Sequence, residues 1–343
     1  MATCASTLKL EAFETSNERA AFFVIGDTHY LADEESPQIL HERSRRLTTG
    51  HVETLKKLPG STIPDTAGGG VVAQPRGLIH AGDLIDSGDK QGANWEKMQA
   101  TEWKAFTSDF GIDGTDGRLK YPVFEVYGNH DGPQGKGLAI DGVASRSRKR
   151  TGIAKVSPNG LHYSWDWGKF HFVNLGITVG QAPEVTQRRR YQPMNSLDFL
   201  IEDLKENVGK SGRPVLLTHH VDVVRYSIPC VADDPANVSR EWHPCDVRSY
   251  HQAIRDYNVI AIFYGHTHTR NILHWDGEST RVENGISLFN VDNSSHFKLA
   301  QQSFFYFELT DSELRVRECT SRDDWLSYEW TPQVWQQSIR LGF

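Results

Sequence analysis

The feature that most constrains this 343-residue chain is a set of short apolar segments that each end abruptly in polar residues. In the clearest one, apolar and aromatic residues dominate 121–127, and Gly128, Asn129, His130 and Asp131 follow directly. Four more segments share the pattern, the last without a glycine: FFVIGDTH (22–29), LIHAGD (78–83), IAIFYGHTH (260–268) and VLLTHH (215–220). Short apolar runs bounded by turn residues predict buried strands. Five such strand ends predict one site assembled across a sheet.

Composition limits the partners and the compartment. The formal net charge of −7 provides no basic field for nonspecific nucleic-acid binding, so no nucleic-acid partner is expected. Four scattered cysteines without a CxxC motif are too few for a disulfide scaffold, and we expect Cys230 and Cys245, which flank one loop, to stay unpaired. The sequence shows neither a signal peptide nor a membrane span. It therefore predicts a soluble cytoplasmic protein.

The order of the segments predicts an α/β fold with one main domain. We expect a polar N-terminal arm at 1–20, a single domain at 21–320, and an aromatic tail at 321–343 that packs on the domain. Helical spacing of apolar residues predicts helices near 36–58, 91–110 and 197–204. Aromatic alternation around 161–176 predicts a hairpin that opens a second sheet, to which we assign further strands at 286–291, 303–309 and 314–318. Two packed β-sheets with helices outside are the expected architecture.

The polar side chains at the strand ends form a set of metal ligands. Imidazoles, carboxylates and an amide oxygen, without thiolates, suit divalent metals such as Mn, Fe, Zn or Co. Seven ligands are too many for one tetrahedral ion and fit two metals that share a carboxylate. Two metals roughly 3.5–4 Å apart are a known device for cleaving phosphate esters. The set comprises Asp27, His29, Asp83, Asn129, His219, His266 and His268.

The order of these motifs resembles the calcineurin-like metallophosphoesterase superfamily. The family pattern D-x-H, G-D-x-x-D, G-N-H-D, H and G-H-x-H appears in sequence at 27–29, 82–86, 128–131, 219 and 265–268, and the resemblance covers about residues 21–310. It implies a four-layer αββα sandwich of two mixed sheets, with residues 21–320 as the catalytic domain. It also implies a dinuclear metal centre, with Mn, Fe or Zn as the expected ions.

The resemblance further implies how the ligands divide. Asp27, His29 and His268 would hold one metal, Asn129, His219 and His266 the other, and Asp83 would bridge them. At 219–220 either histidine could be the ligand. We favour His219, because family members usually place this ligand directly after the last small residue of the strand, here Thr218.

The implied mechanism is hydrolysis by a hydroxide that bridges the metals. His130 would contact the substrate together with Asn129 and would protonate the leaving group, and Asp131 and Asp86 would orient neighbouring ligands. The basic insertion at 132–160 directly follows His130. We expect its Arg146 and Arg148 to bind further phosphates or carboxylates at the mouth of the site, the alternative being a solvated charge run.

Three functions compete. The leading hypothesis is a phosphomonoesterase acting on a small molecule or a lipid head group. A phosphodiesterase of cyclic nucleotides or glycerophosphodiesters is the alternative, since the same metal site would serve both reactions. A non-catalytic metal-binding scaffold is a third possibility, and the presence of every motif residue argues against it. The sequence leaves the oligomeric state open.

Overall fold

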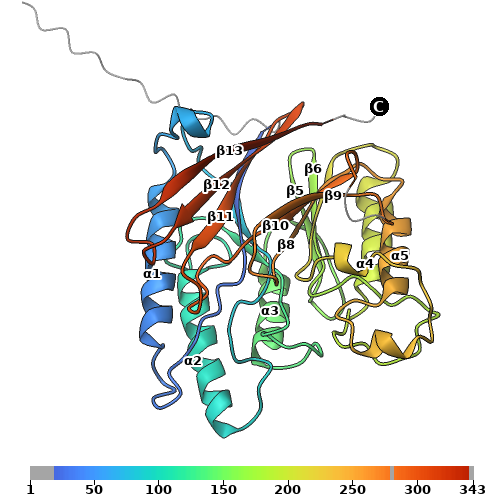
Figure 1. Cartoon of the computed structure of the whole chain (residues 1–343), viewed down its shortest axis with the longest axis horizontal. Helices are drawn as coiled ribbons and strands as arrows, with labels where there is room; N and C mark the ends of the chain where they lie inside the picture. Colours follow the sequence, from blue (N-terminus) through green and yellow to red (C-terminus); the bar gives the residue numbers. More distant parts are fainter. Residues whose placement is uncertain (1–18, 279–281, 340–343) are drawn as a thin grey trace, which may run out of the picture.

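The computed structural model describes residues 19–278 and 282–339, so nearly all of the expected N-terminal arm at 1–20 lies outside the described residues. Six strands form the first sheet, in the order β13-β12-β11-β1-β2-β3. Three of them, β11, β12 and β13, lie side by side in Figure 1. Strands β1, β2 and β3 are parallel, whereas β11, β12 and β13 pair antiparallel. The bounds are β1 (Ala20–Ile25), β2 (Gly77–His80), β3 (Val123–Glu125), β11 (Gln302–Leu309), β12 (Glu313–Ser321) and β13 (Glu329–Ser338).

Seven strands form the second sheet, in the order β4-β5-β6-β7-β8-β10-β9. Strands β6, β7, β8 and β10 are parallel, and the pairs β4–β5, β5–β6 and β9–β10 are antiparallel. The bounds are β4 (Ile153–Val156), β5 (Tyr163–Trp167), β6 (Phe170–Asn174), β7 (Val215–Thr218), β8 (Val259–Tyr264), β9 (Asn271–Trp275) and β10 (Ile286–Asn290). The predicted hairpin is therefore confirmed as β5 and β6.

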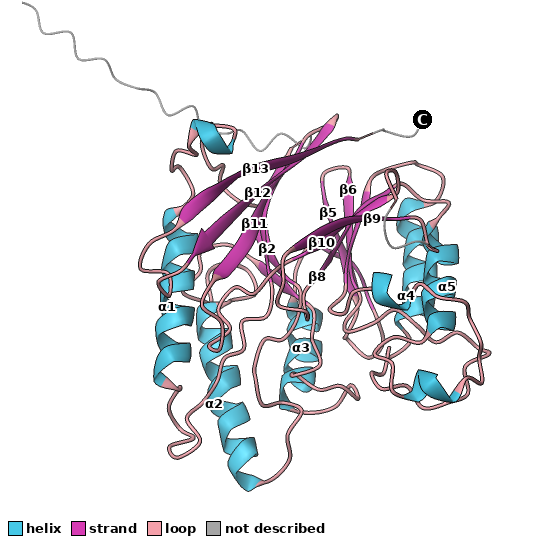
Figure 2. Cartoon of the chain, viewed as in Figure 1, coloured by secondary structure: helices cyan, strands magenta, loops and turns pink. Residues whose placement is uncertain are grey.

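Helices flank the two sheets (Figure 2). In this view α1 (Glu42–Lys57), α2 (Ala93–Asp109) and α3 (Leu138–Lys149) lie on one side, and α4 (Ser196–Asp203) and α5 (Pro244–Ile254) on the other. The sheets face each other: the ring of Phe22 on β1 lies 5.5 Å from that of Phe172 on β6 and 6.0 Å from that of Phe263 on β8. These apolar contacts confirm the predicted fold of two mixed sheets with helices outside.

One expectation at the C-terminal end is wrong. Strands β11 and β12 belong to the first sheet, because β11 pairs antiparallel with β1, and only β10 joins the second sheet. The described part of the aromatic segment expected at 321–343 does contact the domain, since Trp325 is buried and its ring lies 5.3 Å from that of Phe304. This segment also contains the edge strand β13, which pairs with β12. The domain boundaries themselves stay a prediction. Among the described residues, none of the helices combines the length and the apolar character needed to cross a membrane.

Candidate metal centre

The parallel strands bring the predicted ligands to one edge of the fold. Strand β1 is parallel to β2 and β3, and β7 is parallel to β8, so the carboxyl ends within each set point the same way. Backbone hydrogen bonds join the segments that follow: Asp27 N donates to Gly82 O at 3.0 Å, and Gly265 N donates to His220 O at 3.0 Å. Ligands usually bind at the carboxyl ends of parallel strands, and the sequence motifs occupy this position.

Five predicted ligands have positive φ angles, which non-glycine residues adopt infrequently. Each follows directly on one of these strands, where the chain turns sharply. Strained backbone of this kind clusters at functional sites. The angles are 52° at Asp27, 43° at His29, 54° at Asp83, 74° at His266 and 51° at His268.

The first group of donors consists of Asp27, His29, Asp83 and His268, whose ligand atoms all lie within 4.8 Å of one another. His29 Nε2 lies 3.5 Å from Asp83 Oδ2 and 3.2 Å from His268 Nε2. His268 Nε2 lies 3.4 Å from Asp27 Oδ1. Both carboxylates are buried, and buried carboxylates require a counter-charge, so this group suits a cation.

The second group consists of Asp83, His220 and His266, again within 4.8 Å. His220 Nε2 lies 3.1 Å from Asp83 Oδ2 and 3.1 Å from Asn129 Oδ1. Burial raises the pKa of Asp83, but the imidazoles of His220 and His130 outweigh it and hold this pKa well below its ordinary value. Asp83 belongs to both groups, as expected for a carboxylate shared by two cations.

The structure corrects the choice between the two adjacent histidines. His219 faces away from the cluster: its ring packs 4.9 Å from that of Trp242 and 5.6 Å from that of Tyr250. Its Nδ1 bonds to Val221 O at 2.8 Å, and its buried Nε2 has no hydrogen-bond partner among the described residues. Successive residues of an extended chain point to opposite sides, so only one of the two can face the centre, and that residue is His220.

Three hydrogen bonds orient the imidazoles. Asp86 Oδ1 lies 3.0 Å from His29 Nδ1, in the orienting position expected of it, and His220 Nδ1 donates to Ala81 O at 2.7 Å. Glu241 Oε1 lies 3.0 Å from His266 Nε2. Such outer contacts fix ring orientation and tautomer at metal sites. Glu241 was not among the predicted residues, because it lies in a loop that carries no motif.

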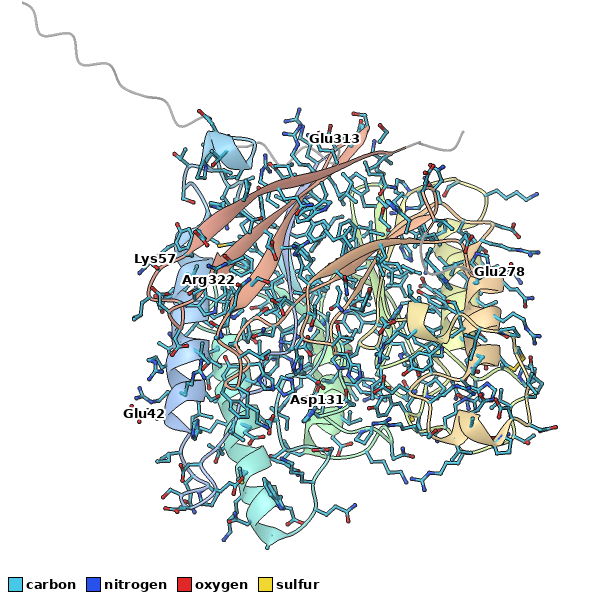
Figure 3. The ribbon with its side chains drawn as sticks, viewed as in Figure 1. Glu42, Lys57, Asp131, Glu278, Glu313 and Arg322 are labelled. Atoms are coloured by element: carbon cyan, nitrogen blue, oxygen red, sulfur yellow. A yellow bond between two sulfur atoms is a disulfide. The ribbon has the colours of Figure 1, made fainter. Side chains whose placement is uncertain are left out.

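His130 and Asp131 take different positions. The backbone N of His130 donates to Asp83 Oδ1 at 2.8 Å, and its Nδ1 bonds to Asp86 O at 2.8 Å. Burial lowers the pKa of His130, but Asp83 and the Asp86 carbonyl outweigh burial and raise it. Asp131, labelled in Figure 3, is buried, and its carboxylate accepts from the backbone N of Gly128, Leu84 and Ile85. It thus joins two ligand-bearing loops.

The two arginines expected at the mouth of the site have different surroundings. Arg146 is buried and pairs with the buried Glu125, with Nε 2.8 Å from Oε1, and Arg150 Nη2 pairs with the same carboxylate. Arg148 is exposed, and its Nη2 donates to Pro158 O at 2.9 Å. The expectation of substrate contacts is wrong for Arg146, whose guanidinium is buried against Glu125, and stays a prediction for Arg148. The pair of Arg146 with Glu125 joins helix α3 to strand β3.

Replacing Glu125 with glutamine is expected to lower the free energy of unfolding by about 3–5 kcal/mol at pH 7, because two buried guanidinium groups lose their counter-charge. Burial raises the pKa of Glu125, but Arg146 and Arg150 outweigh it and lower this pKa from 4.5 to about 2. The stabilisation is therefore complete above pH 4.5 and disappears as the pH falls towards 2. Urea unfolding across this range should show that the two proteins, wild type and Glu125→Gln, become more alike in free energy of unfolding as the pH falls.

The matched control is Glu202→Ala, which removes an exposed ion pair to Lys155 (Nζ to Oε2, 3.2 Å). Exposed pairs contribute about 0–1 kcal/mol, so this variant should unfold almost like wild type. A Glu125→Gln protein as stable as Glu202→Ala at pH 7 would contradict the structural role of the buried pair.

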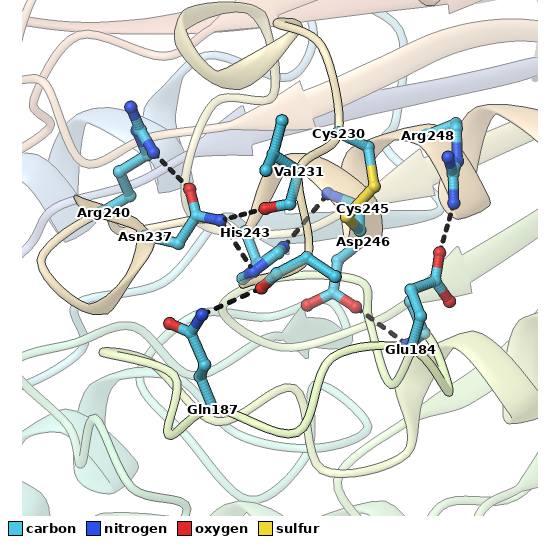
Figure 4. Close-up of a disulfide and its surroundings, with 12 residues drawn as sticks. Glu184, Gln187, Cys230, Val231, Asn237, Arg240, His243, Cys245, Asp246 and Arg248 are labelled. Carbon is cyan, nitrogen blue, oxygen red and sulfur yellow. Dashed lines mark hydrogen bonds and ion pairs between the residues drawn. A yellow bond between two sulfur atoms is a disulfide. The ribbon is translucent and has the colours of Figure 1, made fainter. Parts of the chain in front are cut away.

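The structure also contradicts the expectation that Cys230 and Cys245 stay unpaired, since they form a disulfide (Figure 4). Around this disulfide, Asn237 Nδ2 donates to Val231 O at 2.8 Å and contacts His243 Nε2 at 3.0 Å. The bonds hold the segment that carries Glu241. The cysteine spacing gave no signal for this pairing, because the two residues meet only when the loop folds back on α5.

Comparison with known proteins agrees with this geometry. A model of the calcineurin-like phosphoesterase family matches residues 20–270. A dimetal phosphatase from Danio rerio is similar in structure, with a TM-score of 0.51 at 13% identity over 94% of this chain and 99% of that one. Purple acid phosphatase PPD1 from yellow lupin seeds gives a TM-score of 0.54 at 12% identity, over 95% of this chain and 55% of that one. At these identities the two likenesses show the fold alone.

No curated protein sequence matches the chain significantly. The family match nevertheless extends over most of the chain and spans all the strand ends that carry the donor groups. The chain therefore belongs to the calcineurin-like phosphoesterase family and is a hydrolase of phosphoric esters.

Proposed function

We propose that the chain is a phosphomonoesterase that acts on a small molecule or a lipid-derived phosphate ester at a dinuclear metal centre. The observation that most supports a dinuclear centre is that Asp83 belongs to both donor groups. The proposed ligands are Asp27, His29, Asp83, Asn129, His220, His266 and His268. A phosphodiesterase is the second candidate, since the same residues would serve a diester.

The donor set suits Mn, Fe or Zn. When bound, two such cations supply positive charge to the phosphoryl oxygens and lower the pKa of water. The residues of the chain hold and orient the reacting groups. His130 Nδ1 bonds to the carbonyl of Asp86, which leaves Nε2 as the nitrogen that can protonate the leaving alcohol. Asp131 holds the loop of His130 against the segment after β2.

His130→Ala is expected to lower turnover by about 10²–10⁴-fold while both metals stay bound, because general acid catalysis contributes that much. The loss should be larger for an alkyl phosphate than for p-nitrophenyl phosphate, whose leaving group needs no proton. Steady-state kinetics with both esters and atomic absorption of the purified protein measure this. Equal losses for the two esters, or loss of a metal, would remove His130 from the role of general acid.

The ester class is tested by loading the protein in turn with Mn, Fe, Zn, Co and Mg and comparing a chromogenic phosphomonoester with the matching diester. Asp83→Ala serves as the blank. Faster monoester cleavage that is absent in the blank is the expected result. Faster diester cleavage would instead establish the second candidate, and metal binding without turnover of either ester would favour a scaffold.

A nucleic-acid partner is not proposed, because the net charge is −7. Cytoplasmic location stays a prediction, and the disulfide between Cys230 and Cys245 opposes it, since disulfides are rare in reducing compartments. To decide between a reducing and an oxidising compartment, thiols are alkylated during lysis of cells that express the chain. Mass spectrometry then shows whether Cys230 and Cys245 were alkylated. Alkylated cysteines fit a reducing cytoplasm, whereas a protected pair fits an oxidising compartment.

A further inference from the structure

The segment between β10 and β11 carries a histidine that no motif includes. This segment is hydrogen-bonded to the loop after β1: Gly26 N donates to Ser294 Oγ at 3.2 Å, and Ser294 N donates to Gly26 O at 3.0 Å. Ser295 Oγ donates to Thr28 O at 3.1 Å. These bonds fix the backbone directly before His296 against the loop that bears Asp27 and His29.

His296 lies at the first donor group. Its ring centroid is 4.3 Å from that of His29 and 4.5 Å from that of His268, and one ring nitrogen of each of the three lies within 4.8 Å of the others. The side chain is also stacked on Phe297, with centroids 4.9 Å apart. His296 is therefore held at the centre, although it is not one of the family motif residues.

The hydrogen bonding of His296 indicates a donor rather than a further metal ligand. The backbone N–H of Lys298 donates to His296 Nδ1 at 3.1 Å. Because a backbone N–H can only donate, Nδ1 uses its lone pair in this bond, and the hydrogen of the neutral imidazole is on Nε2. The ring would have to break this bond to coordinate a metal, whereas it can donate from Nε2 without any rearrangement.

A phosphoryl group bound at the centre presents anionic oxygens, which accept strong hydrogen bonds. We propose that Nε2–H of His296 donates a hydrogen bond to a non-bridging oxygen of the phosphoryl group on the His29 and His268 side of the centre. This inference rests on the proposed function and adds a substrate-binding residue to it. Orthophosphate, as the product, would make the same contact.

The test compares wild type, His296→Ala and His296→Gln after loading with Mn. Atomic absorption gives the Mn content, and isothermal titration calorimetry gives the affinity for orthophosphate. We expect two Mn per chain in all three proteins. His296→Ala should bind orthophosphate about 10–100-fold more weakly, as for a lost hydrogen bond to a charged group, and His296→Gln should recover part of this, because its amide can donate. His274→Ala, on β9, is the matched control and should bind like wild type.

Several outcomes would overturn the inference. Loss of one Mn in both His296 variants would make this residue a ligand. Full Mn content with unchanged orthophosphate affinity in His296→Ala would show that His296 does not contact the substrate. Neither result would contradict the proposed function if the wild-type protein still hydrolyses the ester. A wild-type protein that binds Mn but neither binds orthophosphate nor cleaves any ester would overturn the proposed function, and this inference with it.

Discussion

Asp83→Ala is expected to abolish measurable ester hydrolysis and to empty both metal positions. One carboxylate serves both donor groups: Asp83 Oδ2 lies 3.5 Å from His29 Nε2 and 3.1 Å from His220 Nε2. Residues that only orient a ligand cost about 10–100-fold in metal affinity when replaced, so loss of a shared ligand should cost more at each position. Atomic absorption after dialysis against a weak chelator and the monoester assay measure the two losses.

The control for Asp83→Ala is Asp198→Ala, which removes an exposed carboxylate on α4 and should retain metals and turnover. Asp83 Oδ1 also accepts from the backbone N of His130, so circular dichroism and thermal unfolding must show that the variant is folded. A folded Asp83→Ala protein with two metals and wild-type turnover would contradict the shared-ligand proposal.

The sequence was sufficient to predict that the motif residues converge at one place in the fold. The segments at 22–29, 78–83 and 123–131 form parallel strands in one sheet, and those at 215–220 and 260–268 do so in the other. Parallel strands in register place their carboxyl ends together, so polar residues that directly follow buried strands must converge. Six of the seven predicted ligands meet in this way, and their metal-binding roles stay predictions.

Contacts between distant segments could not be predicted. Arg146 was expected at the mouth of the site because the basic insertion that contains it directly follows His130, but Glu125 on β3 pairs with it in the interior. No local pattern in the sequence marks such a pair. Glu241 and His296 were missed for the same reason: each reaches the centre from a loop whose course depends on hydrogen bonds to other segments.

The opposite placement of His219 and His220 could not be predicted either, because both residues follow the same strand. Side chains alternate between the two faces, and the choice of face depends on which sheet surface is covered by helices. Leu216 lies in the apolar core between the sheets, and Leu217 lies in the core that includes the helices. Because alternate residues share a face, His219 is on the same face as Leu217, and His220 is on the same face as Leu216. The sequence alone could not reveal which of these two faces the helices cover.

Phenylalanine substitutions of His219 and His220 should therefore have opposite effects on metal content and turnover. His220→Phe keeps a planar ring but removes the nitrogen 3.1 Å from both Asp83 Oδ2 and Asn129 Oδ1. We expect it to lose one metal and to lower turnover by more than about 100-fold. His219→Phe should retain both metals and most turnover, because its ring already packs against Trp242 and Tyr250.

The expected cost of His219→Phe is in stability. The carbonyl of Val221 loses the hydrogen bond from His219 Nδ1, which should lower the free energy of unfolding by about 1–3 kcal/mol. Metal content, turnover and urea unfolding of the two variants, measured side by side, separate the roles. If His219→Phe loses a metal while His220→Phe keeps both, the placement of the two rings is wrong and His219 is the ligand. Loss of a metal in both variants would mean that packing of the ring at 219, as well as the nitrogen of His220, determines whether the second group can bind its ion.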